Sequence, residues 1–199
     1  DFTNADLSQA SMNEAECPDA CFDGAIMEKV YLKNSDLSGS RFYCAQMEKA
    51  RLTGSNLSKC DFTNALLTEA KIAKADLTEA KLVQAQMERA LLAECNFSKA
   101  EIRDTNLAMA NLDNSDLRKS EWNNVDLQWA DLSGCKLDGV DLSSCQLDDA
   151  TADLGVLSLP AQVPAPHVFI EEPQAAINGK NIAISWKNHE RDRKRIRIL

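Results

Sequence analysis

The sequence predicts an all-β solenoid in which the chain winds as a square coil. Three observations lead to this class. A five-residue period runs from residue 1 to residue 150 without insertion or deletion, a 20-residue period overlies it, and neither fits a standard element. Helices repeat every 3.6 residues and strands every two. A period of five therefore needs a coil in which each pentad forms one side and four sides make one turn.

Each pentad contributes two residues to the predicted core. Residues whose numbers end in 2 or 7, here called central residues, are large and apolar: seventeen of thirty are Leu, five Phe and four Met. Residues whose numbers end in 0 or 5 are small, and seventeen of thirty are Ala. None of these sixty residues is charged. We expect the central residues to point inward and the small residues to let the chain turn the corners.

The 20-residue period predicts ladders of like residues along the coil. One side would stack Phe2, Phe22, Phe42 and Phe62. The next side would stack Met27, Met47 and Met87. Leu77 and Trp122 belong to the same predicted core. With coils about 4.8 Å apart, about seven and a half coils would give a rod roughly 36 Å long.

The pentads also carry a recognisable motif. Ala5-Asp6-Leu7-Ser8-Gln9 and Ala75-Asp76-Leu77-Thr78-Glu79 follow the pattern A(D/N)LXX, as does Ala130-Asp131-Leu132-Ser133-Gly134. Over residues 1–153 the chain resembles the pentapeptide-repeat proteins. The resemblance implies a right-handed quadrilateral parallel β-helix with the central and small residues inside. It implies no common activity, so function has to be argued from the surface.

Beyond the repeats the chain changes character. We expect residues 154–173 to cover the last coil and continue as a proline-rich linker. Residues 174–199 form a basic tail in which Asn178-Gly179 predicts a β-hairpin turn. The first pentad begins in mid-repeat, and an open end of stacked strands invites pairing. We therefore expect either a fragment of a longer protein or a first coil that is buried in an oligomer.

Catalysis, cofactors and metals have little support. Both histidines, His167 and His189, lie in the tail, so residues 1–150 offer no Ser-His or Cys-His pair. No glycine-rich phosphate loop occurs. We expect no enzyme and no cofactor. The formal net charge of −9 argues against direct nucleic-acid binding by the rod.

The seven cysteines are expected to be free thiols. Small positions hold Cys60, Cys95, Cys135 and Cys145, and Cys17 is central, so only Cys21 and Cys44 should face outward. No two cysteines are 20 residues apart, so none stack on adjacent coils and no disulfide or metal site is expected. Unpaired thiols indicate a reducing compartment. With no signal peptide and no long apolar run to span a membrane, we expect a cytoplasmic location.

Two groups of residues are candidates for partner binding. On the rod, outward apolar side chains are predicted at Ile26, Tyr31, Leu66, Leu91 and Trp129, the last sharing a column with Met109. Scattered surface apolars are normal, whereas a cluster would mark an interface. In the tail, the apolar anchors would be Ile182, Ile184 and Trp186, and steering charges would come from Arg193, Arg195 and Arg197. The alternatives are a tail without order and a tail that folds back as a cap.

Two functions from different classes fit the rod. The first is a protein–protein scaffold or adaptor within a larger bacterial protein, for example a secretion accessory protein or effector, with self-association through the coil end or tail as one form. The second follows from the resemblance, since some pentapeptide-repeat proteins mimic DNA and protect DNA gyrase from quinolones. An acidic stripe supports it: Glu16, Asp36, Asp76 and Asp116. Asn56 and Asn96 interrupt this stripe and Lys136 ends it. A purely structural role is the remaining alternative.

The predicted register is testable with two neighbouring substitutions. Leu77→Lys should abolish folding or cost several kcal/mol, because it buries an unpaired charge in the core. Asp76→Lys, one residue away on the outer face, should cost less than about 1 kcal/mol. Denaturant unfolding measures both, and equal effects would show that the register is assigned wrongly.

Overall fold

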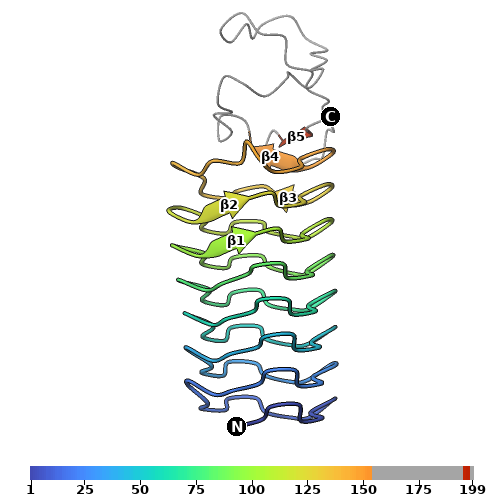
Figure 1. Ribbon diagram of the computed structural model, residues 1–199. Helices are drawn as coiled ribbons and strands as arrows, with labels where there is room; N and C mark the ends of the chain where they lie inside the picture. Colours follow the sequence, from blue (N-terminus) through green and yellow to red (C-terminus); the bar gives the residue numbers. More distant parts are fainter. Residues whose placement is uncertain (154–194, 198–199) are drawn as a thin grey trace, which may run out of the picture.

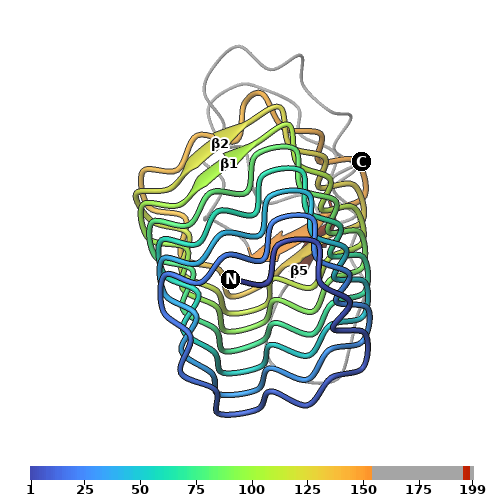
Figure 2. The ribbon, with the colours of Figure 1, turned by 60° about the horizontal axis from the view of Figure 1, so that its bottom comes forward.

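The structure is a computed structural model that describes residues 1–153 and 195–197, and residues 1–153 form a four-sided rod of stacked coils (Figure 1). Residues 20 apart pair in parallel along its length, from Asp6 with Ile26 to Asp126 with Gln146. Figure 2, which looks toward the N-terminal end, shows the same outline repeated from coil to coil. The predicted 20-residue coil is therefore confirmed.

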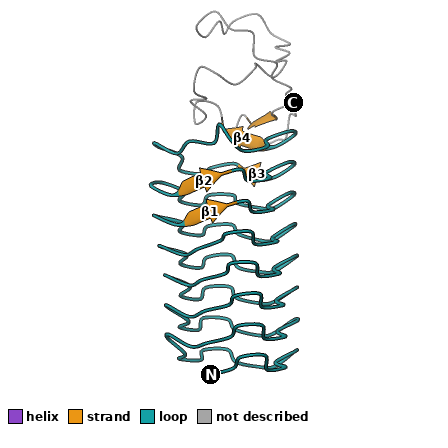
Figure 3. Ribbon diagram, in the orientation of Figure 1, coloured by secondary structure: helices purple, strands orange, loops and turns teal. Residues whose placement is uncertain are grey.

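Regular strands are short, because the turns leave few residues on each side. Strand β1 (Glu101–Arg103) pairs in parallel with β2 (Glu121–Asn123). Strand β3 (Asp131–Leu132) pairs in parallel with β4 (Thr151–Asp153). Most other sides contribute a single bridged residue between turns, so Figure 3 draws them as loop. The described residues contain no helix, and hence none that could cross a membrane.

A β-turn forms most of the corners. The amide of Ala5 donates to the carbonyl of Phe2 at 3.0 Å, and equivalent bonds recur along the rod. The second turn residue, whose number ends in 4 or 9, has a left-handed backbone with φ between 52° and 75° in 24 non-glycine residues and five glycines. Type II turns require positive φ at that position. The corner is thus made by the two residues after the central one, and the small residue closes the turn from inside instead of forming the corner itself.

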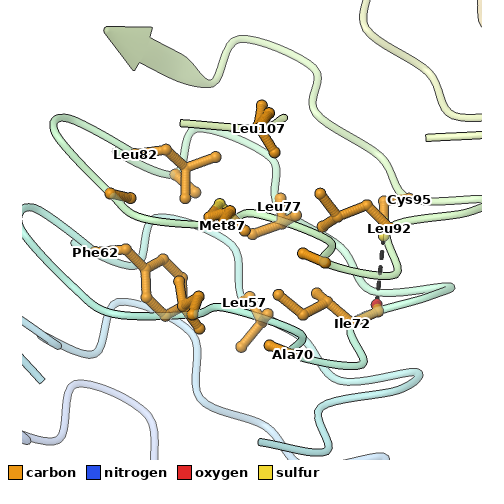
Figure 4. Close-up of a cluster of buried hydrophobic side chains, with 14 of the residues drawn as sticks. Leu57, Phe62, Ala70, Ile72, Leu77, Leu82, Met87, Leu92, Cys95 and Leu107 are labelled. Atoms are coloured by element: carbon orange, nitrogen blue, oxygen red, sulfur yellow. Dashed lines mark hydrogen bonds between the residues drawn. The ribbon is translucent and has the colours of Figure 1, made fainter. Parts of the chain in front are cut away.

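The central residues fill the core as predicted (Figure 4). The rings of Phe2, Phe22, Phe42 and Phe62 stack with centroids 4.9 Å apart, the coil spacing. No solvent reaches Met27, Met47, Met87 or Leu77. The buried indole of Trp122 donates from Nε1 to Ser120 Oγ at 2.7 Å. In the first coil, which is covered on one side only, Phe2 and Cys17 are half-buried.

Polar side chains at small positions bond to the carbonyl of a central residue one coil earlier. Ser35 Oγ donates to the carbonyl of Met12 at 2.9 Å, and Ser115 Oγ donates to that of Leu92 at 2.8 Å. The thiol of Cys95 makes the same bond to the carbonyl of Ile72 at 3.3 Å (Figure 4). Buried hydroxyls and thiols are therefore satisfied, which explains why Ser, Thr and Cys share this position with Ala.

A short strand from the C-terminal tail covers the end of the rod. Strand β5 (Arg195–Arg197) pairs antiparallel with β4, placing Arg197 opposite Thr151 and Arg195 opposite Asp153. This is the cap arrangement, in which the strand pairs an otherwise open sheet edge. Arg195 and Arg197, expected to project toward a partner, thus lie in a strand that pairs with the rod's own last coil. Outside the described residues lie the predicted linker, the hairpin, Ile182, Ile184, Trp186 and Arg193.

The placement of the thiols differs in part from expectation. All seven cysteines are free, but Cys17 and Cys145 are half-buried like Cys21, while Cys44 is exposed. Both Cys17 and Cys145 lie in terminal coils, where the core is covered on one side only. Burial raises the pKa of Cys60, Cys95 and Cys135 to about 12.

We predict a graded pattern of alkylation in the native protein. Iodoacetamide should modify Cys44 first, the half-buried thiols more slowly, and Cys60, Cys95 and Cys135 only on unfolding, because a protonated buried thiol is a poor nucleophile. Peptide mass spectrometry over a time course measures this, with urea-unfolded protein as the control in which all seven react. Native Cys95 reacting as fast as Cys44 would contradict the packing.

Candidate protein-binding surface

Aspartate and asparagine before the central residue cap the turns. Asp36 Oδ1 accepts the amide of Ser38 at 3.0 Å, and Asp76 Oδ1 accepts the amide of Thr78 at 3.0 Å and its hydroxyl at 2.5 Å. Short polar side chains commonly bond to the backbone two residues on in this way. This capping explains the D/N of the A(D/N)LXX pattern. Sequence reasoning missed the role, although the frequent Ser or Thr two residues later signals it.

The predicted acidic stripe exists as a column, but hydrogen bonds within the rod already occupy many of its carboxylate oxygens. Parallel bridges connect Glu16, Asp36, Asn56, Asp76, Asn96, Asp116 and Lys136 in succession. Within this column Asn56 Nδ2 donates to Asp36 Oδ1 at 3.0 Å. Hydrogen bonds from Ser38 and Asn56 hold the pKa of Asp36 below its ordinary value. Amides and turn caps therefore use much of the acceptor capacity that an acidic face would offer to a partner.

Asp116 ends the stripe between two cations. Its carboxylate accepts from Arg118 Nη2 at 2.6 Å and Nε at 2.9 Å, and Lys136 Nζ lies 3.5 Å away. Chiefly because of the Arg118 side chain, the pKa of Asp116 is lowered to about 2. This part of the stripe is thus an ion-pair cluster.

Much of the remaining surface charge is paired between coils. Bridged neighbours alternate in sign along Arg41, Asp61, Lys81 and Glu101. At the turns, Lys99 lies 3.0 Å from Glu79, Lys74 lies 3.7 Å from Glu94 and Lys49 lies 3.8 Å from Glu69. Exposed pairs of this kind contribute little stability each. Their consequence is that these columns present no continuous charge of one sign.

In two columns of the rod, the predicted outward apolar residues do not form clusters. Gln46 separates Ile26 from Leu66, and both Arg51 and Lys71 separate Tyr31 from Leu91. The Arg51 guanidinium lies 4.7 Å from the centre of the Tyr31 ring, so that ring has a cation as its neighbour. Ile26 is 39% and Leu91 43% exposed, while Tyr31 and Leu66 are half-buried. Tyr43, which is 48% exposed in a turn, was not among the residues predicted from the sequence.

Met109 and Trp129 do come together. They occupy the same corner in successive coils, where the amide of Met109 donates to the carbonyl of Gln128 and that of Trp129 to Asp148. Their side chains are 43% and 48% exposed. Leu91 lies just past this corner on the next side, one coil earlier than Met109. We call Leu91, Met109 and Trp129 the apolar corner.

Chemistry-bearing groups are dispersed over the rod. Within residues 1–153 and 195–197, no three His, Cys, Asp or Glu side chains are placed to hold a metal ion. The groups with shifted pKa values are turn-capping or ion-paired carboxylates, their cationic partners and core thiols, each accounted for by the fold. The apolar corner is therefore the strongest candidate for a functional site.

We predict that Asp116 makes the stability of the rod pH-dependent in acid. Its pKa falls from 3.8 to about 2 on folding, so its contribution is full above pH 3.8 and is lost as pH falls through about 2. In Asp116→Asn the turn cap can persist, as it does at Asn56 and Asn96, but the titrating charge is gone. Urea unfolding between about pH 5 and about pH 2 should show a shallower loss of stability in the variant. Arg118→Gln should reproduce this change, and parallel pH profiles for parent and variants would exclude the cluster as its origin.

Comparisons with known proteins agree with the fold. Residues 75–151 match the family described as a pentapeptide repeat region, and residues 1–28, 28–58 and 45–82 match the pentapeptide repeats (8 copies). Both are repeat families rather than catalytic ones. A comparison with curated protein sequences gives no match.

A solved structure with a TM-score above 0.5 shows a similar architecture. A trypsin-treated point variant of QnrB1, a plasmid-mediated fluoroquinolone resistance protein, is 18% identical with a TM-score of 0.51, over 76% of this chain and 78% of that one. HetL, a pentapeptide-repeat protein involved in heterocyst differentiation regulation in the cyanobacterium Nostoc sp. strain PCC 7120, is 25% identical with a TM-score of 0.26, over 71% and 78% of the two chains. The family matches together span the coils described above, and this chain belongs to the pentapeptide-repeat family.

Proposed function

We propose that this chain is a non-enzymatic scaffold or adaptor that binds a protein partner through the outer surface of its rod. The observation that carries the proposal is the apolar corner, where Met109 and Trp129, 43% and 48% exposed, occupy the same corner in successive coils. Burial of side chains of this size against a partner stabilises the complex.

The architecture suits a scaffold. In a solenoid each coil contacts only its neighbours, so the outer faces can vary without disturbing the core. As part of the proposal we take the rod to be a right-handed β-helix of about seven and a half coils. We place it in the cytoplasm, as a module of a larger bacterial protein.

A second candidate is a DNA-mimicking rod that binds DNA gyrase. The observation that favours it is the acidity of residues 101–150, which carry eleven acidic and four basic residues. The paired charge columns and the interrupted stripe argue against it, because a DNA mimic needs regularly spaced, uncompensated charge. The likeness to QnrB1, at 18% identity, supports a common fold. Protein binding through apolar contacts remains the better supported function.

Two experiments on the full chain separate these functions. In a DNA gyrase supercoiling assay with a quinolone, we expect no protection at about 10 μM chain, a concentration that would nearly saturate a complex with a Kd of about 1 μM. Immobilised chain should capture a protein from extracts of its source cells, and the purified protein should bind with a Kd below about 10 μM by calorimetry. Protection of gyrase would instead establish the second candidate, and no purified protein binding in this range would remove the first.

A further inference from the structure

We propose that the apolar corner docks an extended, basic segment of a protein partner, with an apolar side chain of that segment seated against Met109 and Trp129. This inference rests on the proposed protein-binding function and assigns it a place on the rod and a partner chemistry. Four observations carry it: backbone conformation, local charge, the orientation of the side chains, and the strand already bound beside the corner.

Met109 and Trp129 are unusual occupants of their backbone position. Both occupy the left-handed second turn position, with φ of 59° and 57°. This conformation is the ordinary turn geometry of the rod, but the side chains that adopt it elsewhere are of other kinds. Every other left-handed residue of the rod is glycine, cysteine, an amide or a charged residue. The two large apolar residues in this conformation are thus consecutive in one column, and both are exposed.

The charge around the corner is predominantly negative, with the Arg89 guanidinium beside Met109 as the exception. The two sides that meet there comprise residues 106–115, 126–135 and 146–153 at the C-terminal end of the rod, and they hold six carboxylates and no lysine or arginine. These carboxylates belong to Asp113, Asp126, Asp131, Asp148, Asp149 and Asp153. All four basic residues of 101–150 lie on the other two sides: Arg103, Arg118, Lys119 and Lys136. The complementary partner is therefore basic, and a nucleic acid is disfavoured.

Neighbouring side chains hold the two anchors in place. Trp129 Nε1 donates to Asp149 Oδ2 at 2.9 Å in the next coil. Arg89 belongs to the preceding coil, and its Nε lies 3.4 Å from Met109 Sδ. Anchors that are already oriented lose less conformational entropy on binding. Tryptophan is also among the residues most enriched at binding hot spots, next to a polar rim such as Asp148 and Asp149 provide.

The chain itself shows that an extended basic strand fits this end of the rod. Strand β5 contains Arg195 and Arg197 and pairs with β4, which begins two residues after Asp149. The backbone edge of the last coil is thus engaged, whereas the exposed side of the corner is open to a second segment. A partner segment of similar charge would meet the carboxylates around the corner while burying the apolar side chains.

The test uses the full chain and variants that should fold at least as well. Asparagine tolerates the left-handed region and occupies the equivalent turn position at Asn114 and Asn124. We therefore compare the parent with the Met109→Asn/Trp129→Asn double variant. The matched control is Tyr43→Asn, which removes an equally exposed aromatic side chain from another corner. Thermal unfolding should show no loss of stability in the double variant, which separates binding from folding.

The probe is a fluorescein-labelled peptide in which arginines flank a central Leu-Trp pair, followed by fluorescence anisotropy. The double variant should bind it at least about tenfold more weakly than the parent, and Tyr43→Asn within about twofold of it. Binding should weaken with added salt. Peptides with glutamate for arginine, or with alanine for the Leu-Trp pair, should bind poorly.

Three results with the probe would overturn the inference: no binding to the parent, equal affinity in parent and double variant, or equal losses in the double variant and Tyr43→Asn. If the double substitution changes only the sedimentation of the free chain, the corner is a contact between copies of the chain. That result would likewise overturn the inference. Binding of the protein captured from cell extracts tests the proposed function independently of the peptide probe. If that partner binds parent and double variant alike, the scaffold function stands and the corner assignment fails.

Discussion

The structure depends on the parallel pairing of each residue with the residues 20 before and 20 after it. This pairing places like residues in stacks inside the rod, and outside it brings some opposite charges together, as at Arg41 and Asp61. It also couples turns in adjacent coils. A Cβ added at Gly54 would lie 2.5 Å from Asn34 Oδ1, and one at Gly39 would lie 2.2 Å from Asp19 Oδ1. In both cases a short polar side chain in one coil faces a glycine in the next, whereas a Cβ at Gly139 would meet nothing within 4 Å.

The same pairing explains why the register has no insertions over 150 residues. One extra residue would move every later central residue out of the core and every later turn residue away from a corner. It would also break the hydrogen bonds that small residues such as Ser35 and Cys95 make to the preceding coil. The core therefore constrains sequence strongly at the central and small positions. The bridge and turn positions remain free to vary, provided that a turn can form.

The sequence allowed the core to be predicted well, because a period of five with uncharged central and small residues has few structural solutions. Phe42, Met47 and Leu77 are buried as that period requires. The residues at which the chain turns could not be predicted from hydrophobicity, because left-handed turn residues such as Lys59 and Glu94 resemble ordinary surface residues. Tail residues Arg195 and Arg197 were expected to project, whereas β5 pairs with β4. A strand of three residues after a long non-repeating segment carries no period from which its pairing could be derived.

The apolar corner was visible in sequence only as a shared column, and its significance depends on the backbone. An exposed methionine or tryptophan is common in itself. Met109 and Trp129 occupy a left-handed turn position that elsewhere in the rod holds glycine, cysteine, an amide or a charged residue. Because the core of a solenoid does not depend on its outer turn residues, folding gives no reason to place large apolar side chains there. Recognition does give one, since the left-handed turn directs these side chains away from the rod, where a partner can bury them.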